Sequence, residues 1–223
     1  MAWGLVEPLG SGDYFPDGDY VGWEEKIRRY FYEEMSAQQR AKFDDWDVSY
    51  RAEIARAFTE DMGALEPHQQ PRQFKFQKNP TSLSSLVKLN DRLLVVDETL
   101  KSIIETLESD VHQFWPLEFI LRNGKDRLAP HYGMIIRQFR NSLVPELSEV
   151  RREDYPTCTF YYGAGLTKKD YARISVSRAK IDGAHLWREE MLRTPGILIS
   201  DALQAEVTRR GLRIFKHHKL NEA

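Results

Sequence analysis

The residues of this chain that are able to do chemistry do not assemble into a recognised catalytic motif. Gly163-Ala-Gly165 precedes Lys168, but the spacing is not that of a phosphate-binding loop, and glycines in this arrangement favour a tight turn between strands. The patterns GxSxG, HExxH and CxxC are absent. The one cysteine, Cys158, lies in a strand-like run, which predicts a buried and unreactive thiol.

The sequence predicts neither a metal site nor a cofactor site. Among the six histidines only His217 and His218 are adjacent, and neighbours in a strand point to opposite faces. Asp17-Gly18-Asp19 resembles part of a calcium loop but lacks the other ligands at the required intervals. The paired carboxylates Glu24-Glu25 and Glu189-Glu190 would lie about 100° apart on a helix and need not converge. We therefore expect no metal ion and no cofactor.

The composition excludes several classes of protein. Hydrophobic residues make up 41% and charged residues 30% of the 223 residues, as in ordinary globular proteins. The net charge of −2 argues against a strongly basic nucleic-acid-binding protein. A single cysteine excludes an internal disulfide and is typical of a reducing compartment. The first residues lack a signal-peptide pattern, and no window approaches the ~18 apolar residues of a membrane span. We therefore expect a cytoplasmic protein that binds neither a membrane nor nucleic acid directly.

The charge is unevenly distributed along the chain. Residues 1–66 hold fifteen acidic and seven basic residues, a net charge of −8. Residues 67–223 hold nineteen acidic and twenty-five basic residues, a net charge of +6. An asymmetry of this size indicates something about the binding partners of the protein or about how the two parts of the chain contact each other. It says nothing about the fold itself.

Two stretches read as complete strand–helix–strand units. In Pro195–Leu220 an apolar run is followed by a cap at Ser200 or Asp201, an apolar helical stripe, a stop at Gly211 and a strand over Leu212–Phe215. In Leu93–Phe119 the same order appears, with Asp97 as the cap and a return strand from Val111. Val96 and Ile199 correspond at an offset of 103 residues, which indicates a weak internal repeat, although any capped helix between two strands would look similar.

The rest of the pattern predicts helices first and strands later. Helices are expected over Trp23–Met35, from Ser36 to about Asp45, and from Asp47 or Ser49 to Gly63, with an aromatic stripe that faces a core. Strand patterns occupy 73–77, 131–139, 158–162 and 173–177. The expected fold class is α+β, a mainly antiparallel sheet with packed helices and an acidic helical N-terminal segment. Residues 1–66 would form that acidic loop and helical segment and 67–223 the α+β domain, unless the two are one continuous domain.

Three short motifs resemble a bacterial immunity-protein family, immunity family eleven of polymorphic toxin systems. They are His185-Leu-Trp-Arg188, Ile197-Leu-Ile-Ser-Asp-Ala-Leu203 and Gly211-Leu212-x-Ile-Phe215. The stretch Val95–Leu100 fits the middle region of that family. The resemblance covers roughly residues 90–220, and Arg213 stands where a second glycine is usual. The first 65 residues or so show no such resemblance.

The resemblance implies a protein that binds and silences a cognate toxin without catalysis. Toxins associated with the family are often nucleases, which need basic surfaces to hold phosphates. An acidic inhibitor would associate faster with such a toxin and would compete with nucleic acid for its basic surface. We therefore expect contacts from the acidic front, with its two tryptophans as anchors if they are exposed. The candidate residues are Asp13, Asp17, Asp19, Trp23, Glu24, Glu25, Asp44, Asp45, Trp46 and Asp47.

Three alternatives remain open at this point. The acidic residues can simply solvate the helices that carry them, as exposed charges usually do. The chain can be an enzyme of unrecognised type that acts through His185, Cys158 or Glu118. It can also be an adaptor or an oligomeric structural module, in which the acidic front of one copy meets the basic rear of another. The oligomeric state does not follow from the sequence.

Overall fold

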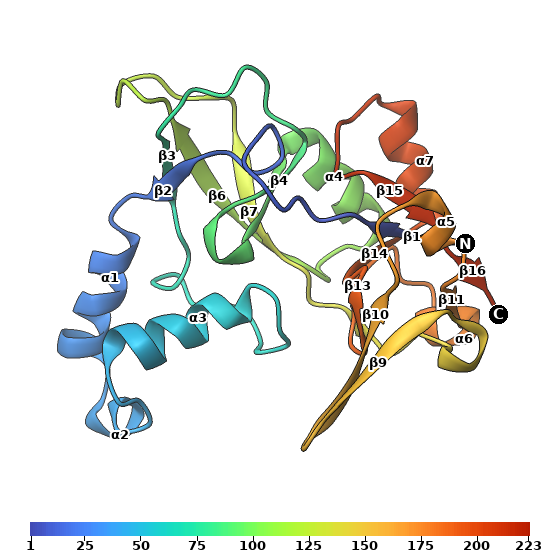
Figure 1. The fold of residues 1–223 in the computed structure, drawn as a ribbon. Helices are drawn as coiled ribbons and strands as arrows, with labels where there is room; N and C mark the ends of the chain where they lie inside the picture. Colours follow the sequence, from blue (N-terminus) through green and yellow to red (C-terminus); the bar gives the residue numbers. More distant parts are fainter. The chain divides into compact units, whose positions relative to one another are not determined.

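The chain divides into two units, and each unit combines distant parts of the sequence. The computed structural model describes residues 1–223 (Figure 1). Unit 1 comprises Met1–Leu9, Ser102–His112 and Ile136–Ala223, and unit 2 comprises Gly10–Lys101 and Gln113–Ile135. The chain leaves unit 2 within helix α4 (Glu98–Leu107). The expected division at residue 66 is therefore not the one that the contacts define.

Unit 2 is built on a six-stranded sheet in the order β2-β3-β6-β7-β5-β4. Its strands are β2 (Gly18–Tyr20), β3 (Gln73–Phe76), β4 (Leu86–Lys88), β5 (Leu94–Asp97), β6 (Gln113–Ile120) and β7 (His131–Ile135). Neighbouring strands are antiparallel except for the parallel pair β3 and β6. A 3-10 turn, η3 (Asn90–Arg92), joins β4 to β5.

The helices of unit 2 are shorter and less regular than the sequence predicts. They are α1 (Trp23–Arg29), η1 (Tyr30–Glu34), α2 (Ala37–Arg40), η2 (Trp46–Arg51) and α3 (Ala52–Ala57), with π-helical hydrogen bonding in η1 and η2. The third predicted helix ends at Ala57 rather than at Gly63, and Met62 is exposed. The prediction that the aromatic stripe faces a core is confirmed, since Phe31, Tyr50 and Phe58 are buried.

One core joins these helices to the sheet. Trp23 and Phe58 from the helices belong to the same buried cluster as Phe74, Trp115 and Phe119 from the strands. Burial of such large side chains contributes roughly 1.5–3 kcal/mol each. Residues 10–66 therefore depend on strands that come later in the chain and do not form a domain of their own.

Unit 1 contains three sheets. Their strand orders are β15-β1-β14-β12-β8, β13-β10-β9 and β11-β16. The strands are β1 (Ala2–Leu5), β8 (Phe139–Arg140), β9 (Val150–Tyr155), β10 (Cys158–Gly163), β11 (Ser175–Val176), β12 (Leu186–Glu189), β13 (Leu192–Thr194), β14 (Ile197–Ser200), β15 (His217–Lys219) and β16 (Asn221–Glu222). The helical segments are η4 (Pro145–Leu147), α5 (Lys168–Tyr171), α6 (Arg178–Ile181) and α7 (Asp201–Arg209).

The two strand–helix–strand stretches share a topology. In unit 2, β7 lies between β5 and β6 and is antiparallel to both. In unit 1, β1 takes the corresponding place between β14 and β15. β4 and β12 lie on the outer sides of β5 and β14, again antiparallel. The weak sequence repeat therefore corresponds to a similar strand order, completed in the first motif by the next strand, β7, and in the second by the distant strand β1.

The caps of the two helices correspond as well. Asp97 accepts a hydrogen bond from the amide of Leu100 at 2.8 Å, and Ser200 accepts one from Leu203 at 3.2 Å. Gly211 has φ +63° directly after α7, as predicted for a helix stop. The predicted strand over Leu212–Phe215 is wrong, because these residues are irregular and the return strand is β15.

These elements confirm the α+β fold class with mainly antiparallel sheets. None of the helices has the length and apolar character that crossing a membrane requires.

Candidate partner-binding surface

The residues expected to bind a partner all lie in unit 2. Most of them belong to two neighbouring segments, α1 and residues 44–51, which together are here called the helical corner. Arg51 connects its parts, because Nε lies 2.9 Å from the Glu24 carboxylate and a terminal nitrogen lies 3.2 Å from Asp91. Arg28 stands over the ring of Trp46, with 5.7 Å from guanidinium carbon to ring centroid. The corner is therefore an ordered surface of mixed charge.

Three carboxylates of the helical corner have no partner. Glu25, Asp44 and Asp47 are exposed, and none of them forms a hydrogen bond or an ion pair. A carboxylate that the fold does not use keeps its charge available to another molecule. These three residues are the part of the predicted set that is free to act on a partner.

Asp45 has a structural role in the same segment. Its Oδ1 accepts hydrogen bonds from the amides of Val48 at 2.7 Å and Ser49 at 3.2 Å, which caps η2. A capping carboxylate satisfies amide groups that the helix itself leaves unpaired. A substitution at Asp45 would therefore change the fold and the surface charge together.

The two tryptophans differ in exposure. Trp23 is only 2% exposed, and its Nε1 donates to the carbonyl of Gln69 at 2.7 Å. The condition set for Trp23 as an anchor, exposure of its ring, is therefore not met, because the ring fills the core of unit 2. Trp46 is half-buried and packs against that core from the edge, so part of its ring remains accessible.

The aromatic layer under the corner is held by a histidine. His68 stacks on Tyr30 with 3.5 Å between ring centroids, and its Nε2 lies 2.8 Å from the Tyr50 hydroxyl. Burial lowers the pKa of His68, which favours the neutral imidazole. His68 thus joins η1, through Tyr30, to η2, through Tyr50, as a neutral side chain.

The acidic residues of the first loop form a separate group. Asp13 accepts from the Ser82 hydroxyl at 3.0 Å, Asp17 from Ser11 at 2.5 Å, and Asp19 from the Asn90 side chain at 3.2 Å. Asp13 and Asp19 thus tie this part of the chain to later segments, and Asp17 closes its own loop. The structure does not bring these three residues into contact with Asp44, Asp45 and Asp47.

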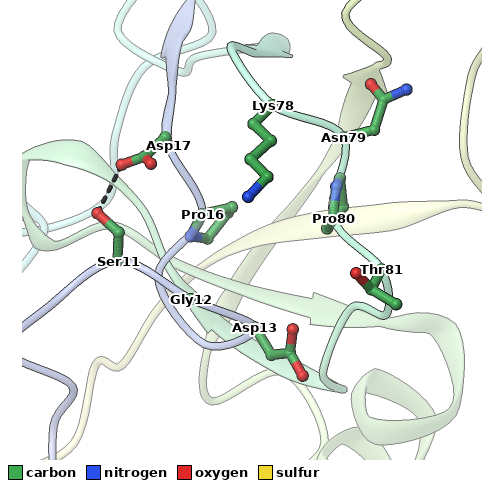
Figure 2. Close-up of a pocket in the computed structure, with 9 residues that line it drawn as sticks. All are labelled: Ser11, Gly12, Asp13, Pro16, Asp17, Lys78, Asn79, Pro80 and Thr81. Atoms are coloured by element: carbon green, nitrogen blue, oxygen red, sulfur yellow. Dashed lines mark hydrogen bonds between the residues drawn. The ribbon is translucent and has the colours of Figure 1, made fainter.

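A pocket of about 200 Å³ lies between this loop and the connection after β3. Its walls are residues 11–13, 16–17 and 78–81 (Figure 2). Figure 2 shows the Lys78 side chain extending toward Pro16, while Asp17 turns to Ser11 on the other side. Asn79 is occupied, because its Oδ1 accepts from the amide of Arg122 at 2.7 Å. The pocket presents one free ammonium group and no converging set of polar groups.

The residues of the enzyme alternative differ in their surroundings. Cys158 is exposed near the tip of the β9–β10 hairpin, so the prediction of a buried thiol is wrong. His185 lies before β12, where Nδ1 is 2.8 Å from the Ser200 hydroxyl. Glu118 belongs to unit 2 and pairs with Arg127 at 3.0 Å. Across the chain, no group of three or more His, Cys, Asp or Glu side chains is arranged to hold a metal ion.

The sequence reasoning missed one buried polar centre in unit 1. Glu108 accepts from His112 Nε2 at 2.8 Å, Gln138 at 2.5 Å, and the amides of His185 at 2.6 Å and Leu186 at 3.1 Å. Burial opposes its ionisation, yet these hydrogen bonds outweigh it and lower the pKa of Glu108. The four-residue spacing of Glu108 and His112 was the available signal. With every acceptor position used, this centre holds the fold together and leaves no group free for chemistry.

The charge asymmetry is weaker in the folded units than along the chain. Unit 2 holds nineteen acidic and sixteen basic residues, a net charge of −3, and unit 1 holds fifteen and sixteen, a net charge of +1. The difference arises because residues 67–101 and 113–135, which are rich in bases, fold with the acidic front. The folded unit that contains the acidic front therefore carries only a small net negative charge.

Comparison with known proteins gives one match. A family model described as the immunity protein family Imm11 matches residues 26–222, nearly the whole chain. The match begins much earlier than the resemblance over residues 90–220, so it includes residues 44–51 and the part of α1 from Lys26 onward, but not Glu24 or Glu25. No curated protein sequence matches the chain.

Proposed function

Because this chain belongs to the immunity protein family Imm11, we propose that it binds a cognate bacterial toxin and neutralises it. The neutralisation is occlusion by a bound protein, in the cytoplasm of the cell that makes it, and needs no catalysis and no cofactor. The family match carries this proposal, since it covers most of both units and residues 44–51 of the helical corner.

We assign the first contact with the toxin to the helical corner. The free carboxylates of Glu25, Asp44 and Asp47 provide unpaired negative charges on an ordered frame. A nuclease toxin carries basic groups for the phosphates of its substrate. Opposite charges on two proteins accelerate their association and suppress wrong partners. A nuclease is therefore the toxin class that this surface fits best.

The experiment uses the toxin domain encoded by the neighbouring reading frame. Binding kinetics are measured at low and high salt for the wild type and for the double variant Asp44→Lys/Asp47→Lys, which leaves the Asp45 cap intact. The matched control is Glu146→Lys/Glu190→Lys in unit 1, which changes the net charge equally at two exposed residues. Growth of cells that co-express toxin and variant reports neutralisation.

We expect the corner variant to associate about tenfold more slowly at low salt, with a smaller difference at high salt because ions screen exposed charges. The control should keep the wild-type rate within about threefold. Equal rates for the two variants would show that the corner does not steer the toxin. A wild-type chain that neither binds the toxin domain nor rescues growth would contradict the proposed function itself.

A further inference from the structure

The β9–β10 hairpin of unit 1 has one face that is packed and one that is not. In Figure 1 this yellow-to-orange hairpin extends well past β13. Val150 and Tyr161 pack against the core of unit 1. Side chains alternate along a strand, so the register places Tyr155, Phe160 and Tyr162 on the opposite face. Phe160 and Tyr162 are half-buried on that face, and Tyr155 at its far end is 49% exposed.

Two arginines lie on this aromatic face and organise it. The guanidinium carbon of Arg193 in β13 is 3.7 Å from the ring centroid of Phe160, and that of Arg151 is 5.1 Å from Tyr162. Tyr155 continues the row at 5.8 Å from Phe160. A stacked guanidinium is held in one orientation with its donors free at the edge. The face is thus an ordered ladder of rings and arginines.

The two arginines differ in their partners. Arg151 is paired with Glu153 at 2.8 Å. Arg193 is exposed and has no carboxylate within reach of its donors. An oriented guanidinium with free donors matches a carboxylate in two-pronged geometry. Arg193 is therefore the one arginine of this face without a carboxylate partner, and a bound protein would supply that carboxylate.

We propose that this aromatic face, Arg151, Tyr155, Phe160, Tyr162 and Arg193, docks a carboxylate-bearing, partly apolar surface of the cognate toxin. The inference rests on the proposed function and adds a second contact with a different role. Tyrosine and arginine are the residue types that most often dominate binding energy at protein interfaces. Contacts of this kind hold a complex together and so act on dissociation, whereas the helical corner acts on association.

A protein partner fits this face better than a nucleic acid. The hairpin strands carry Arg151 and Arg152 but also Glu153 and Asp154, so their charges cancel. Binding to a phosphate backbone requires several uncompensated cations. Only Arg193 is uncompensated here, which suits a single carboxylate.

The experiment compares variants on the two faces of the same sheet. Arg193→Glu and Tyr155→Ala alter the open face. Arg152→Glu is the matched control, because it makes the same charge change on the opposite face of the hairpin. Dissociation of each from the toxin domain of the neighbouring reading frame is measured, together with hydrogen exchange of the hairpin amides with and without that domain. Light scattering tests whether a second copy of the chain binds this face, and a labelled single-stranded oligonucleotide tests whether a nucleic acid does.

We expect Arg193→Glu to dissociate about 30-fold faster or more, Tyr155→Ala about tenfold faster, and Arg152→Glu within about threefold of the wild type. Hairpin amides should exchange more slowly in the complex. Unchanged dissociation of Arg193→Glu from a toxin that the wild type binds would overturn this inference and leave the proposed function standing. Self-association or oligonucleotide binding that Arg193→Glu abolishes would also overturn it, in favour of a second copy or a nucleic acid. A wild-type chain that binds no toxin would remove both proposals.

Discussion

His112 and Glu108 form a buried pair, joined by a hydrogen bond between the ring Nε2 and the carboxylate. The amide of Arg137 donates to His112 Nδ1 at 3.3 Å, so the ring proton must lie on Nε2, which faces the Glu108 carboxylate at 2.8 Å. Both side chains are almost inaccessible to solvent. A neutral imidazole and an ionised carboxylate therefore connect the end of α4 to the segment that enters β12.

Removal of the Glu108 carboxylate should destabilise unit 1. The substitution Glu108→Ala leaves the donors of His112, Gln138 and two backbone amides without an acceptor. Unsatisfied buried donors cost roughly 1–3 kcal/mol each before relaxation, so we expect a loss of about 3 kcal/mol or more in the free energy of unfolding. Urea unfolding measures it, with exposed Glu190→Ala as the control. A loss below about 1 kcal/mol would show that water replaces the carboxylate.

The same carboxylate should make stability depend on pH in acid. The folded pKa of Glu108 lies below its usual value of 4.5, so the ionised form stabilises the fold above that pH. This contribution is lost as the pH falls through the folded pKa. The difference in unfolding free energy between wild type and Glu108→Gln should therefore be largest near neutral pH and shrink below pH 4.5. A difference that stays constant across this range would contradict the lowered pKa.

Gly133 in β7 should not tolerate a side chain. A Cβ at this position would lie 2.4 Å from a ring atom of Trp115. The ring is buried and held by a hydrogen bond from Nε1 to the carbonyl of Pro71 at 2.7 Å. Gly133→Ala should therefore destabilise unit 2 by about 1–3 kcal/mol, the usual effect of overpacking. Thermal unfolding checks this, and Gly12→Ala, where a Cβ meets nothing within 4 Å, is the control. Equal melting temperatures for the two variants would contradict a rigid Trp115.

Substitutions at Asp45 should distinguish the stabilising effect of its helix cap from the effect of its negative charge. Asp45→Asn keeps an oxygen that accepts from Val48 and Ser49, whereas Asp45→Ala removes the cap. We expect Asp45→Ala to lose about 1 kcal/mol of stability and Asp45→Asn to stay near the wild type. Asp44→Ala, at a residue without partners, controls for loss of surface charge. If Asp45→Ala and Asp44→Ala unfold at the same denaturant concentration, the cap is not needed for η2.

The local features of the chain could be predicted from its sequence. The caps at Asp97 and Ser200, the stop at Gly211 and the buried stripe of α1 depend on residues a few positions apart. Hydrogen bonds and periodicity over such distances are written in the order of residues. The family resemblance depended on the same short motifs, and the match to Imm11 confirmed it over a longer stretch.

Features that depend on distant segments could not be predicted in this way. Nothing near residue 199 indicates that Ala2–Leu5 pairs between β14 and β15, or that Phe74 and Trp115 cover Trp23. The residues next to Cys158 in the sequence are those of a buried strand. The thiol is nevertheless exposed, because it lies near the tip of the β9–β10 hairpin.

The sequence alone thus determined where the two longest helices, α4 and α7, begin, which residues are apolar and which family the motifs resemble. The tertiary structure decided which carboxylates remain free, which aromatic rings stay open to solvent and how the two units divide the chain. The physical reason is that exposure depends on what packs above a side chain, and strand pairing over more than a hundred residues leaves no periodic trace near either strand.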